Sequence, residues 1–187
     1  MLSRKIVILF SGTGTNLLNL IDTLSDEVEI TAAVTNKPKA PGIEKAQSRG
    51  VHVDIIDHTL YHSREDFDEV LVATISRYKP DLVVLAGFMR ILTPIFTANV
   101  RAINLHPSLL PKFKGARAIE RSFESDDPHG GVSVHWVSGE LDGGTVIEQQ
   151  SFEKVLDESL ESFTKKIQAN EYALLPETII ELLKNDA

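Results

Sequence analysis

Three side chains have types suited to moving a proton and stabilising a developing charge. Asn104 and His106 stand two residues apart in AINLHP, an apolar run that reads as a strand and is ended by its proline. Residues two apart on a strand share a face, so the carboxamide and the imidazole can reach one point. Asp142 precedes two glycines in GELDGG, a turn-forming stretch able to return its carboxylate to His106. The pattern predicts acid–base chemistry at one site.

Each member of this trio has an expected role. Asn104 offers amide donors to a developing oxyanion, and His106 is the side chain best suited to exchange a proton near neutrality. A carboxylate beside an imidazole favours the charged ring, so Asp142 is expected to raise the pKa of His106. Two plainer interpretations stay open from sequence: a structural histidine, and an aspartate that only forms a turn.

Other site chemistries have less support. His106, His135 and Asp142 are a conceivable metal set, but no close-spaced ligand pair exists, so no metal is expected. Ser11 and Ser108 do not stand in a nucleophile-elbow sequence, which disfavours covalent acyl transfer. The chain has no cysteine, which excludes disulfides, thiolate zinc sites and cysteine nucleophiles.

A glycine loop, SGTGTN, follows the first apolar run and precedes a helical pattern. Gly12 and Gly14 let the backbone approach a ligand closely, and a helix N-terminus attracts an anion. The dinucleotide fingerprint needs a third glycine, where Leu17 stands, and an acidic residue near Asn36. The Gly-Lys-Ser/Thr ending of a nucleotide-triphosphate loop is also absent. The loop therefore predicts a single-phosphate site, with a simple tight turn as the alternative.

Short β-rich runs alternate with helical patterns through most of the chain, which is typical of a parallel α/β sheet covered on both faces. The last two runs are joined only by SGELDGG, which predicts an antiparallel hairpin and hence a mixed sheet. The expected strands are KIVILFS, VEITAAVTN, VHVDII, DLVVLAG, AINLH, GVSVHWV and TVIEQQSF. With no repeat or flexible linker, residues 1–187 are expected to form one domain.

The helical patterns have recognisable ends. Ser63 is the expected N-cap of the third, with Asp66 three residues on and Pro80 just past its end. Pro176 stands inside the last pattern and predicts a kink or two helices there. The expected helices are Asn16 to Leu24, Ile43 to Arg49, Arg64 to Tyr78, Ala118 to Ser125 and Leu160 to Leu183.

Composition limits the partners. A formal net charge of -8 and a pI of about 5.2 argue against a nucleic-acid surface, which needs clustered Lys and Arg. A small anionic substrate is still compatible, since backbone N–H groups can hold it. The first apolar run, Ile6 to Phe10, is too short for a signal peptide or a membrane span. We expect a cytoplasmic protein acting on small molecules; the sequence does not predict its oligomeric state.

Five motifs together resemble those of one enzyme family. SGTGTNL, LAGFMRIL, NLHPSLLP, SVHWV and ELDGG occur in the order and spacing of the folate-dependent glycinamide ribonucleotide formyltransferases of purine synthesis. The resemblance covers nearly the whole chain. It implies a Rossmann-like, doubly wound domain that transfers a formyl group from 10-formyltetrahydrofolate, a co-substrate, to the amine of glycinamide ribonucleotide through a tetrahedral intermediate.

The resemblance also implies roles for individual residues. Its catalytic trio corresponds to Asn104, His106 and Asp142. Its ribonucleotide contacts correspond to Gly12, Thr13, Gly14, Thr15, Asn16, Pro107, Gln168 and Glu171. Its folate contacts correspond to Arg64, Met89, Arg90, Ile91, Leu92, Asn104, Glu140, Leu141 and Asp142. A solvated Glu171, and Met89 and Leu92 as core residues, are the plainer alternatives.

The chain departs from the family pattern after HPSLLP. There the family commonly has Pro-Gly followed by His or Asp, whereas this chain has KFKGARAIERSF, with Lys114 and Arg117. That stretch leans towards the methionyl-tRNA formyltransferases, and Thr145 replaces a usual Pro. The alternatives are therefore a formyltransferase for another amine, such as a sugar nucleotide or aminoacyl-tRNA, a formyltetrahydrofolate hydrolase, or a binding module without turnover.

Overall fold

The structure is a computed structural model that describes residues 4–24 and 28–185. Its centre is a 7-stranded sheet in the order β3-β2-β1-β4-β5-β6-β7. The first five strands are parallel, and β6 and β7 are antiparallel to their neighbours. The expected mixed α/β sheet with an antiparallel C-terminal hairpin is thus confirmed. The strands are β1 Arg4–Phe10, β2 Val28–Thr35, β3 Val53–Ile55, β4 Leu82–Leu85, β5 Ala102–His106, β6 His129–Trp136 and β7 Val146–Glu153.

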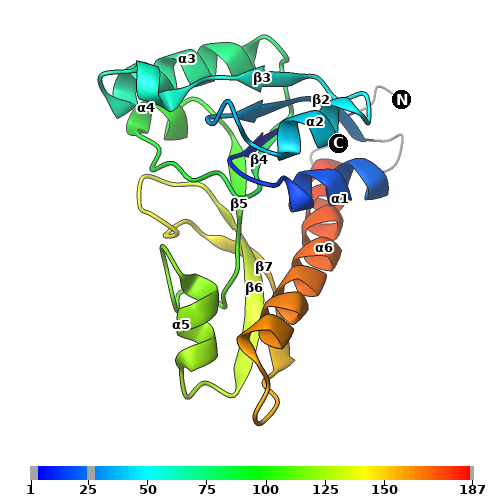
Figure 1. The fold of residues 1–187 in the computed structure, drawn as a ribbon. Coiled ribbons are helices and arrows are strands. Elements are labelled where there is room, and N and C mark those ends of the chain that lie inside the picture. Colours follow the sequence, from blue (N-terminus) through cyan, green and yellow to red (C-terminus); the bar gives the residue numbers. More distant parts are fainter. Residues whose placement is uncertain (1–3, 25–27, 186–187) are drawn as a thin grey trace.

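Helices cover both faces of the parallel part of the sheet. Alternate β1 residues point to opposite sides: Ile6 and Ile8 pack with α1, α2 and α6, whereas Val7 and Leu9 pack with α3 and α4. Figure 1 shows these two layers on either side of the strands. The helices are α1 Thr15–Thr23, α2 Gly42–Gln47, α3 Arg64–Ser76, α4 Pro94–Thr97, α5 Ala118–Glu124 and α6 Leu160–Asn185, with a 3-10 turn at His58–Leu60.

The helix predictions were right in number and place for the long segments. Ser63 caps α3, accepting a hydrogen bond from the backbone N–H of Asp66 at 3.0 Å. The short α4 was not expected, and the predicted ends differ from the observed ones by at most two residues, because local pattern does not fix where a helix frays.

Pro176 does not divide the last helix into two, so that alternative was wrong. It lacks the N–H that would bond to the carbonyl oxygen of Tyr172, four residues earlier. Asn19 of α1 supplies the missing donor, its Nδ2 lying 3.0 Å from that oxygen. Helix α6 therefore continues for 26 residues through the proline.

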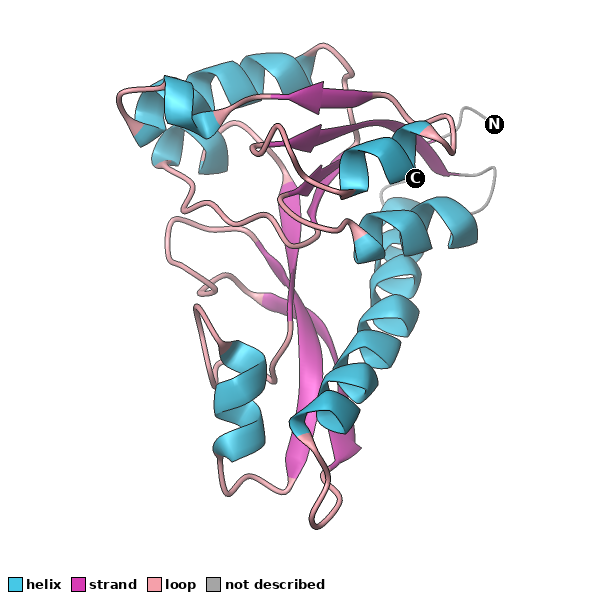
Figure 2. Ribbon diagram, viewed as in Figure 1, coloured by secondary structure: helices cyan, strands magenta, loops and turns pink. Residues whose placement is uncertain are grey.

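The strand order reverses between β1 and β4, and this point positions the site. The chain runs outward from β1 to β3 and then returns to β4 on the other side of β1. Ligands of open α/β sheets bind beside such a switch point, outside the carboxyl ends of the strands. The β6–β7 hairpin runs on beyond the shorter parallel strands, flanked by α5 and α6 (Figure 2). None of the helices in the described ranges is both long and apolar enough to cross a membrane.

Candidate active site

The end of β5 carries the first two members of the predicted trio. Strand β5 pairs with β6 so that Asn104 lies opposite His135 and His106 lies opposite Ser133. His106 is buried, whereas Asn104 is half-buried. A strand with alternating orientation thus directs a carboxamide and an imidazole to the same side of the sheet.

The loop between β6 and β7 brings Asp142 to both of them. Its Oδ2 lies 3.4 Å from Nδ1 of His106, and its Oδ1 accepts from Nδ2 of Asn104 at 3.3 Å. The backbone N–H of Gly115 donates to Oδ2 at 2.7 Å, fixing the carboxylate from a second loop. The structure therefore brings the three predicted residues together, although Asp142 is distant from the others in sequence.

Two glycines follow Asp142 in its turn. Asp142 itself has a left-handed φ of 48°. A Cβ on Gly144 would lie 1.7 Å from the carbonyl oxygen of Trp136, and one on Gly143 would lie 2.4 Å from Cδ of Glu140. The clash at Gly144 is with backbone, so no side chain fits there, whereas the clash at Gly143 is with the exposed side chain of Glu140, which can move. Gly144 is therefore the glycine that this turn requires.

Burial sets the direction of the His106 pKa, and this corrects the expected upward shift. Desolvation lowers the pKa of His106 and outweighs the backbone carbonyl of Phe113 and the charge of Asp142, which raise it. For Asp142, burial raises the pKa, but the neighbouring His135 side chain, the hydrogen bond from the Gly115 N–H and the electrostatic effect of His106 together bring it below the ordinary value. The favoured pair is a neutral ring beside an ionised carboxylate.

The ring nitrogens of His106 both have partners in the protein. Nε2 lies 2.9 Å from the backbone carbonyl oxygen of Phe113. A carbonyl oxygen only accepts, so Nε2 carries the hydrogen. Phe113 has a left-handed φ of 57° and stands in the KFKGAR stretch that departs from the family pattern.

Sequence reasoning missed the contribution of His135 to the trio. Its Nε2 lies 3.1 Å from Nδ2 of Asn104 and 3.6 Å from Oδ1 of Asp142. The residue was considered only as a metal ligand, and within the described ranges no group of three His, Cys, Asp or Glu could hold a metal ion. The available signal was the alternation in SVHWV, since His135 shares a strand face with Ser133.

The glycine loop forms a compact turn before α1. Gly14 has φ 69°, and a Cβ there would lie 3.2 Å from Cα of Gly42, the first residue of α2. Gly12, Thr13 and Thr15 are exposed, and no side chain caps α1. The first backbone N–H groups of the nine-residue helix thus remain available to an anion.

Glu171 of α6 reaches this loop from far along the chain. Nδ2 of Asn16 donates to its Oε2 at 3.1 Å, across 155 positions. Burial raises the pKa of Glu171, partly opposed by that hydrogen bond. Oδ1 of Asn16 is buried with no partner among the described residues. Gln168, one turn earlier on α6, is exposed, and Pro107, after His106, is half-buried.

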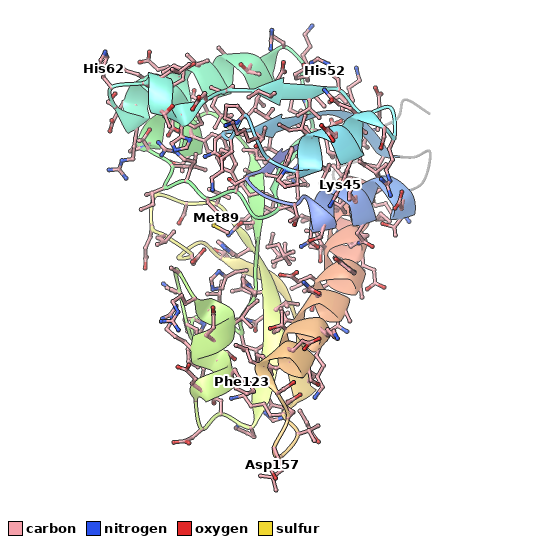
Figure 3. The ribbon with its side chains drawn as sticks, viewed as in Figure 1. Lys45, His52, His62, Met89, Phe123 and Asp157 are labelled. Atoms are coloured by element: carbon pink, nitrogen blue, oxygen red, sulfur yellow. The ribbon has the colours of Figure 1, made fainter. Side chains whose placement is uncertain are left out.

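The predicted folate wall lies on two loops, at 86–93 and 139–143. Met89, Ile91 and Leu141 expose 71%, 54% and 52% of their surface, unusually much for large apolar side chains. Met89 lies between the part of the molecule that carries α3 and the part that carries α5 (Figure 3). By contrast, Leu92 packs against the core formed with α3 and α4, as its plainer interpretation predicted. Arg64 and Glu140 are exposed.

Charged contacts brace this wall from its sides. The guanidinium of Arg90 stacks on Phe67 of α3, 4.9 Å from the ring centroid. Lys114 pairs with Glu140 at 2.8 Å and so joins the loop at 112–117 to the loop at 139–143. The Lys114 and Glu140 side chains are 36% and 70% exposed. Solvent therefore screens this ion pair, which holds the two loops together only weakly.

Ser11 connects the glycine loop with the predicted folate wall. Its backbone N–H donates to the carbonyl oxygen of Gly87, and its Oγ accepts from the N–H of Met89 at 2.7 Å. The same hydroxyl donates to Oδ1 of Asn36 at 2.5 Å. Ser11 is therefore a buried support between the two loops, in keeping with its exclusion as a nucleophile.

A cavity of about 210 Å³ is lined in part by Phe113, whose carbonyl oxygen lies 2.9 Å from Nε2 of His106. It includes no predicted site residue and is lined by Leu109, Lys112, Phe113, Ser122, Asp127, His129 and Ser151.

Fold and site together define a Rossmann-like α/β enzyme in which Asn104, His106 and Asp142 meet at the carboxyl end of the strands. Residues 4–179 match the model of the formyl transferase family. The chain belongs to the formyl transferase family.

Individual relatives agree with this assignment. Phosphoribosylglycinamide formyltransferase of Escherichia coli (strain K12) is 40% identical over 177 residues, which are 92% of this chain and 84% of that protein. The human trifunctional purine biosynthetic protein adenosine-3 is 33% identical over 92% of this chain, which matches 18% of its length. The crystal structure of phosphoribosylglycinamide formyltransferase from Campylobacter jejuni has a TM-score of 0.93 and 49% identity, covering 97% of this chain and 98% of that one.

Proposed function

We propose that this enzyme transfers the formyl group of 10-formyltetrahydrofolate to the amine of glycinamide ribonucleotide. The observation that carries the proposal is the meeting of Asn104, His106 and Asp142 between an anion-binding loop and an exposed apolar wall. The relatives named as phosphoribosylglycinamide formyltransferases support this acceptor.

The ribonucleotide binds at the β1–α1 loop in this proposal. The phosphate accepts hydrogen bonds from the free N–H groups of α1 and from the side chains of Thr13, Thr15 and Asn16. Gly12 and Gly14 allow the phosphate to approach the backbone closely. Glu171 and Gln168 of α6 and Pro107 contact the sugar and the glycinamide part. The unpartnered Oδ1 of Asn16 supports a ligand donor at this position.

The folate lies against the other wall. Its flat pterin packs on the exposed side chains of Met89 and Ile91, and backbone groups of the same loop, including Leu92, pair with its polar edge. Leu141 and Glu140 cover it from the hairpin side. Arg64 and Arg90 supply positive charge for the acidic tail of the folate. The high exposure of Met89, Ile91 and Leu141 supports a wall that a ligand covers.

The transfer proceeds by direct attack, gaining most of its rate from proximity. The amine nitrogen forms a bond to the formyl carbon, and the carbonyl electrons move to its oxygen. Collapse breaks the bond to the folate nitrogen, which leaves with the bonding pair and takes up the proton released by the amine. His106, or a water beside it, carries that proton. No covalent enzyme intermediate and no metal enter this scheme.

His106 serves as a donor to the formyl oxygen once the substrates bind. In the free enzyme its Nε2–H donates to the carbonyl oxygen of Phe113. The formyl oxygen is also a carbonyl oxygen, so it can replace Phe113 as the acceptor with little change in the ring. Asp142 stabilises the charged form that the ring assumes while it holds the proton.

We also propose that residues 1–187 act as one domain, in the cytoplasm, on small-molecule substrates and without nucleic-acid or membrane partners. The continuous sheet and the core shared by β1, α1 and α6 support a single unit. The negative net charge supports the absence of a nucleic-acid surface.

The test combines purified protein with glycinamide ribonucleotide and 10-formyltetrahydrofolate, following formylated product and tetrahydrofolate together. Parallel tubes omit the acceptor or replace it with an amino-sugar nucleotide or aminoacyl-tRNA. Equal formation of both products, dependent on glycinamide ribonucleotide, is expected. Tetrahydrofolate without acceptor would instead identify a hydrolase, and product only with another amine would reassign the acceptor. Folate binding without product in any tube would identify a binding module.

A further inference from the structure

We infer that His135 is a positioning residue that turns the carboxamide of Asn104 so that its oxygen, Oδ1, faces the attacking amine. This inference rests on the proposed function for the identity of the amine. It assigns a role to a buried histidine outside the predicted trio, and it changes the role of Asn104 from oxyanion donor to amine acceptor.

The backbone of Trp136 fixes which nitrogen of His135 carries a hydrogen. Nδ1 of His135 lies 2.9 Å from the carbonyl oxygen of Trp136. That oxygen only accepts, so Nδ1 is the donor. A neutral imidazole has one N–H, and Nε2 of the neutral ring is therefore a bare acceptor. His135 is 2% exposed, so water does not compete for either nitrogen.

Two acceptors then fix the orientation of Asn104. Nε2 of His135 lies 3.1 Å from Nδ2 of Asn104, and Oδ1 of Asp142 lies 3.3 Å from the same nitrogen. An amide –NH2 has two hydrogens, one for each acceptor. In the reversed orientation, Oδ1 of Asn104 would face Nε2 of His135 and the carboxylate of Asp142. All three groups are acceptors, so no hydrogen bond could form between them.

The end of Asn104 left for substrate is an acceptor. Among the described residues, no hydrogen bond reaches Oδ1 of Asn104. An acceptor cannot stabilise an oxyanion, but it can receive an N–H of the amine. Such a bond points the lone pair of the amine at the formyl carbon and stabilises the positive charge that its nitrogen gains during attack. The donor to the formyl oxygen is then His106, the only member of the trio with an N–H facing a carbonyl oxygen in the described structure.

The first test reads the tautomer directly, without substrate. Long-range 1H–15N correlation spectra of full-length protein labelled with 15N-histidine, at pH 8, distinguish a protonated ring nitrogen from a bare one. We expect the proton of His135 on Nδ1 and that of His106 on Nε2, opposite tautomers on the two sides of Asp142. A His135 proton on Nε2 would overturn the inference.

The second test separates positioning from folding. His135→Leu removes the acceptor, and His135→Gln retains one at the place of Nε2. A misplaced nucleophile costs roughly 10- to 100-fold in rate, so we expect His135→Leu to lower kcat about 10-fold or more, with folate affinity within about 2-fold. His135→Gln recovers kcat to within about 3-fold of wild type. His129→Leu, on the exposed end of the same strand, is the matched control and retains wild-type kcat.

The outcomes distinguish the inference from the proposed function. Unchanged kcat in His135→Leu, or equal loss in both His135 variants, would overturn the positioning role. If His135→Leu does not fold by circular dichroism, His135→Gln and the tautomer measurement still decide. If wild-type protein forms no formylated glycinamide ribonucleotide, the proposed function fails, while the tautomer of His135 remains measured.

Discussion

Nε2 of His106 and the carbonyl oxygen of Phe113 are 2.9 Å apart, so a backbone oxygen accepts the hydrogen bond that the candidate acid–base residue donates. In the proposed mechanism, the formyl oxygen replaces this oxygen as the acceptor of the His106 N–H. In the free protein the N–H of His106 is thus engaged by the loop at 112–117, which contains Phe113.

Replacing His106 by Gln is expected to lower kcat by roughly 100-fold or more, since positioned proton transfer contributes about that much. Folate affinity is expected to change little, because the wall at Met89 and Ile91 is untouched. Steady-state kinetics and a folate titration check this. His52→Gln is the control, as His52 is 63% exposed and pairs only at the surface with Asp54. A loss confined to KM would contradict the proton-transfer role.

Asp142→Asn is expected to lower the pKa of His106 further, because the negative charge that raises it is removed while burial remains. A histidine NMR titration of both proteins measures the shift. We also expect kcat to fall by about 10-fold or more, since the ring loses its partner while it holds the proton. An unchanged His106 titration would show that the carboxylate does not act on this ring.

Stability is expected to decrease as the pH falls from 7.5 to 5.5. The pKa of His106 is lower in the folded protein than its ordinary value, so below about pH 6.5 the unfolded chain binds a proton that the folded chain does not. The stabilisation is therefore complete above the unfolded pKa and is lost as pH falls towards the folded one. Urea unfolding at both pH values measures it. His106→Gln should lose less stability than wild type across this interval; an equal loss would assign the effect elsewhere.

Asn19→Ala is expected to reduce the free energy of unfolding by about 1 kcal/mol, because a partly buried carbonyl then loses its donor. The carbonyl is that of Tyr172, which Pro176 leaves without a helical partner. Adding Pro176→Ala restores a backbone N–H, so the cost of Asn19→Ala should be smaller in that background. A double-mutant cycle by urea unfolding tests the coupling. Additive effects would mean that Asn19 acts through other contacts.

Gly14→Ala is expected to cost about 1–2 kcal/mol of stability, because its φ of 69° is unfavourable for residues with a Cβ. The added Cβ also lies 3.2 Å from Cα of Gly42. Gly12→Ala is the matched comparison: its φ is not in the left-handed range and its Cβ meets nothing within 4 Å. Thermal unfolding of both variants is the measurement. Similar losses in the two would contradict a special role for the Gly14 conformation.

Much of the architecture is encoded locally. Short apolar runs alternating with helical patterns predicted the parallel sheet, and the short SGELDGG connection predicted the antiparallel hairpin, because both signals depend on neighbours in sequence. The two-residue spacing of Asn104 and His106 likewise predicted their common side of the sheet. The glycine loop predicted its own tight turn, since Gly14 adopts a conformation that other residues avoid.

The sequence by itself therefore determined the fold class, the family and the three side chains, Asn104, His106 and Asp142, that meet at the candidate site. Only the tertiary structure decided how they act on one another. The pKa of His106 falls rather than rises because burial, which no local pattern measures, outweighs Asp142. The orientation of Asn104 depends on His135, which reaches it through the β5–β6 register, and the carbonyl oxygen that Pro176 leaves free in α6 is bonded by Asn19 of α1. Such effects arise from contacts between distant segments, whose distances are set when the whole chain packs.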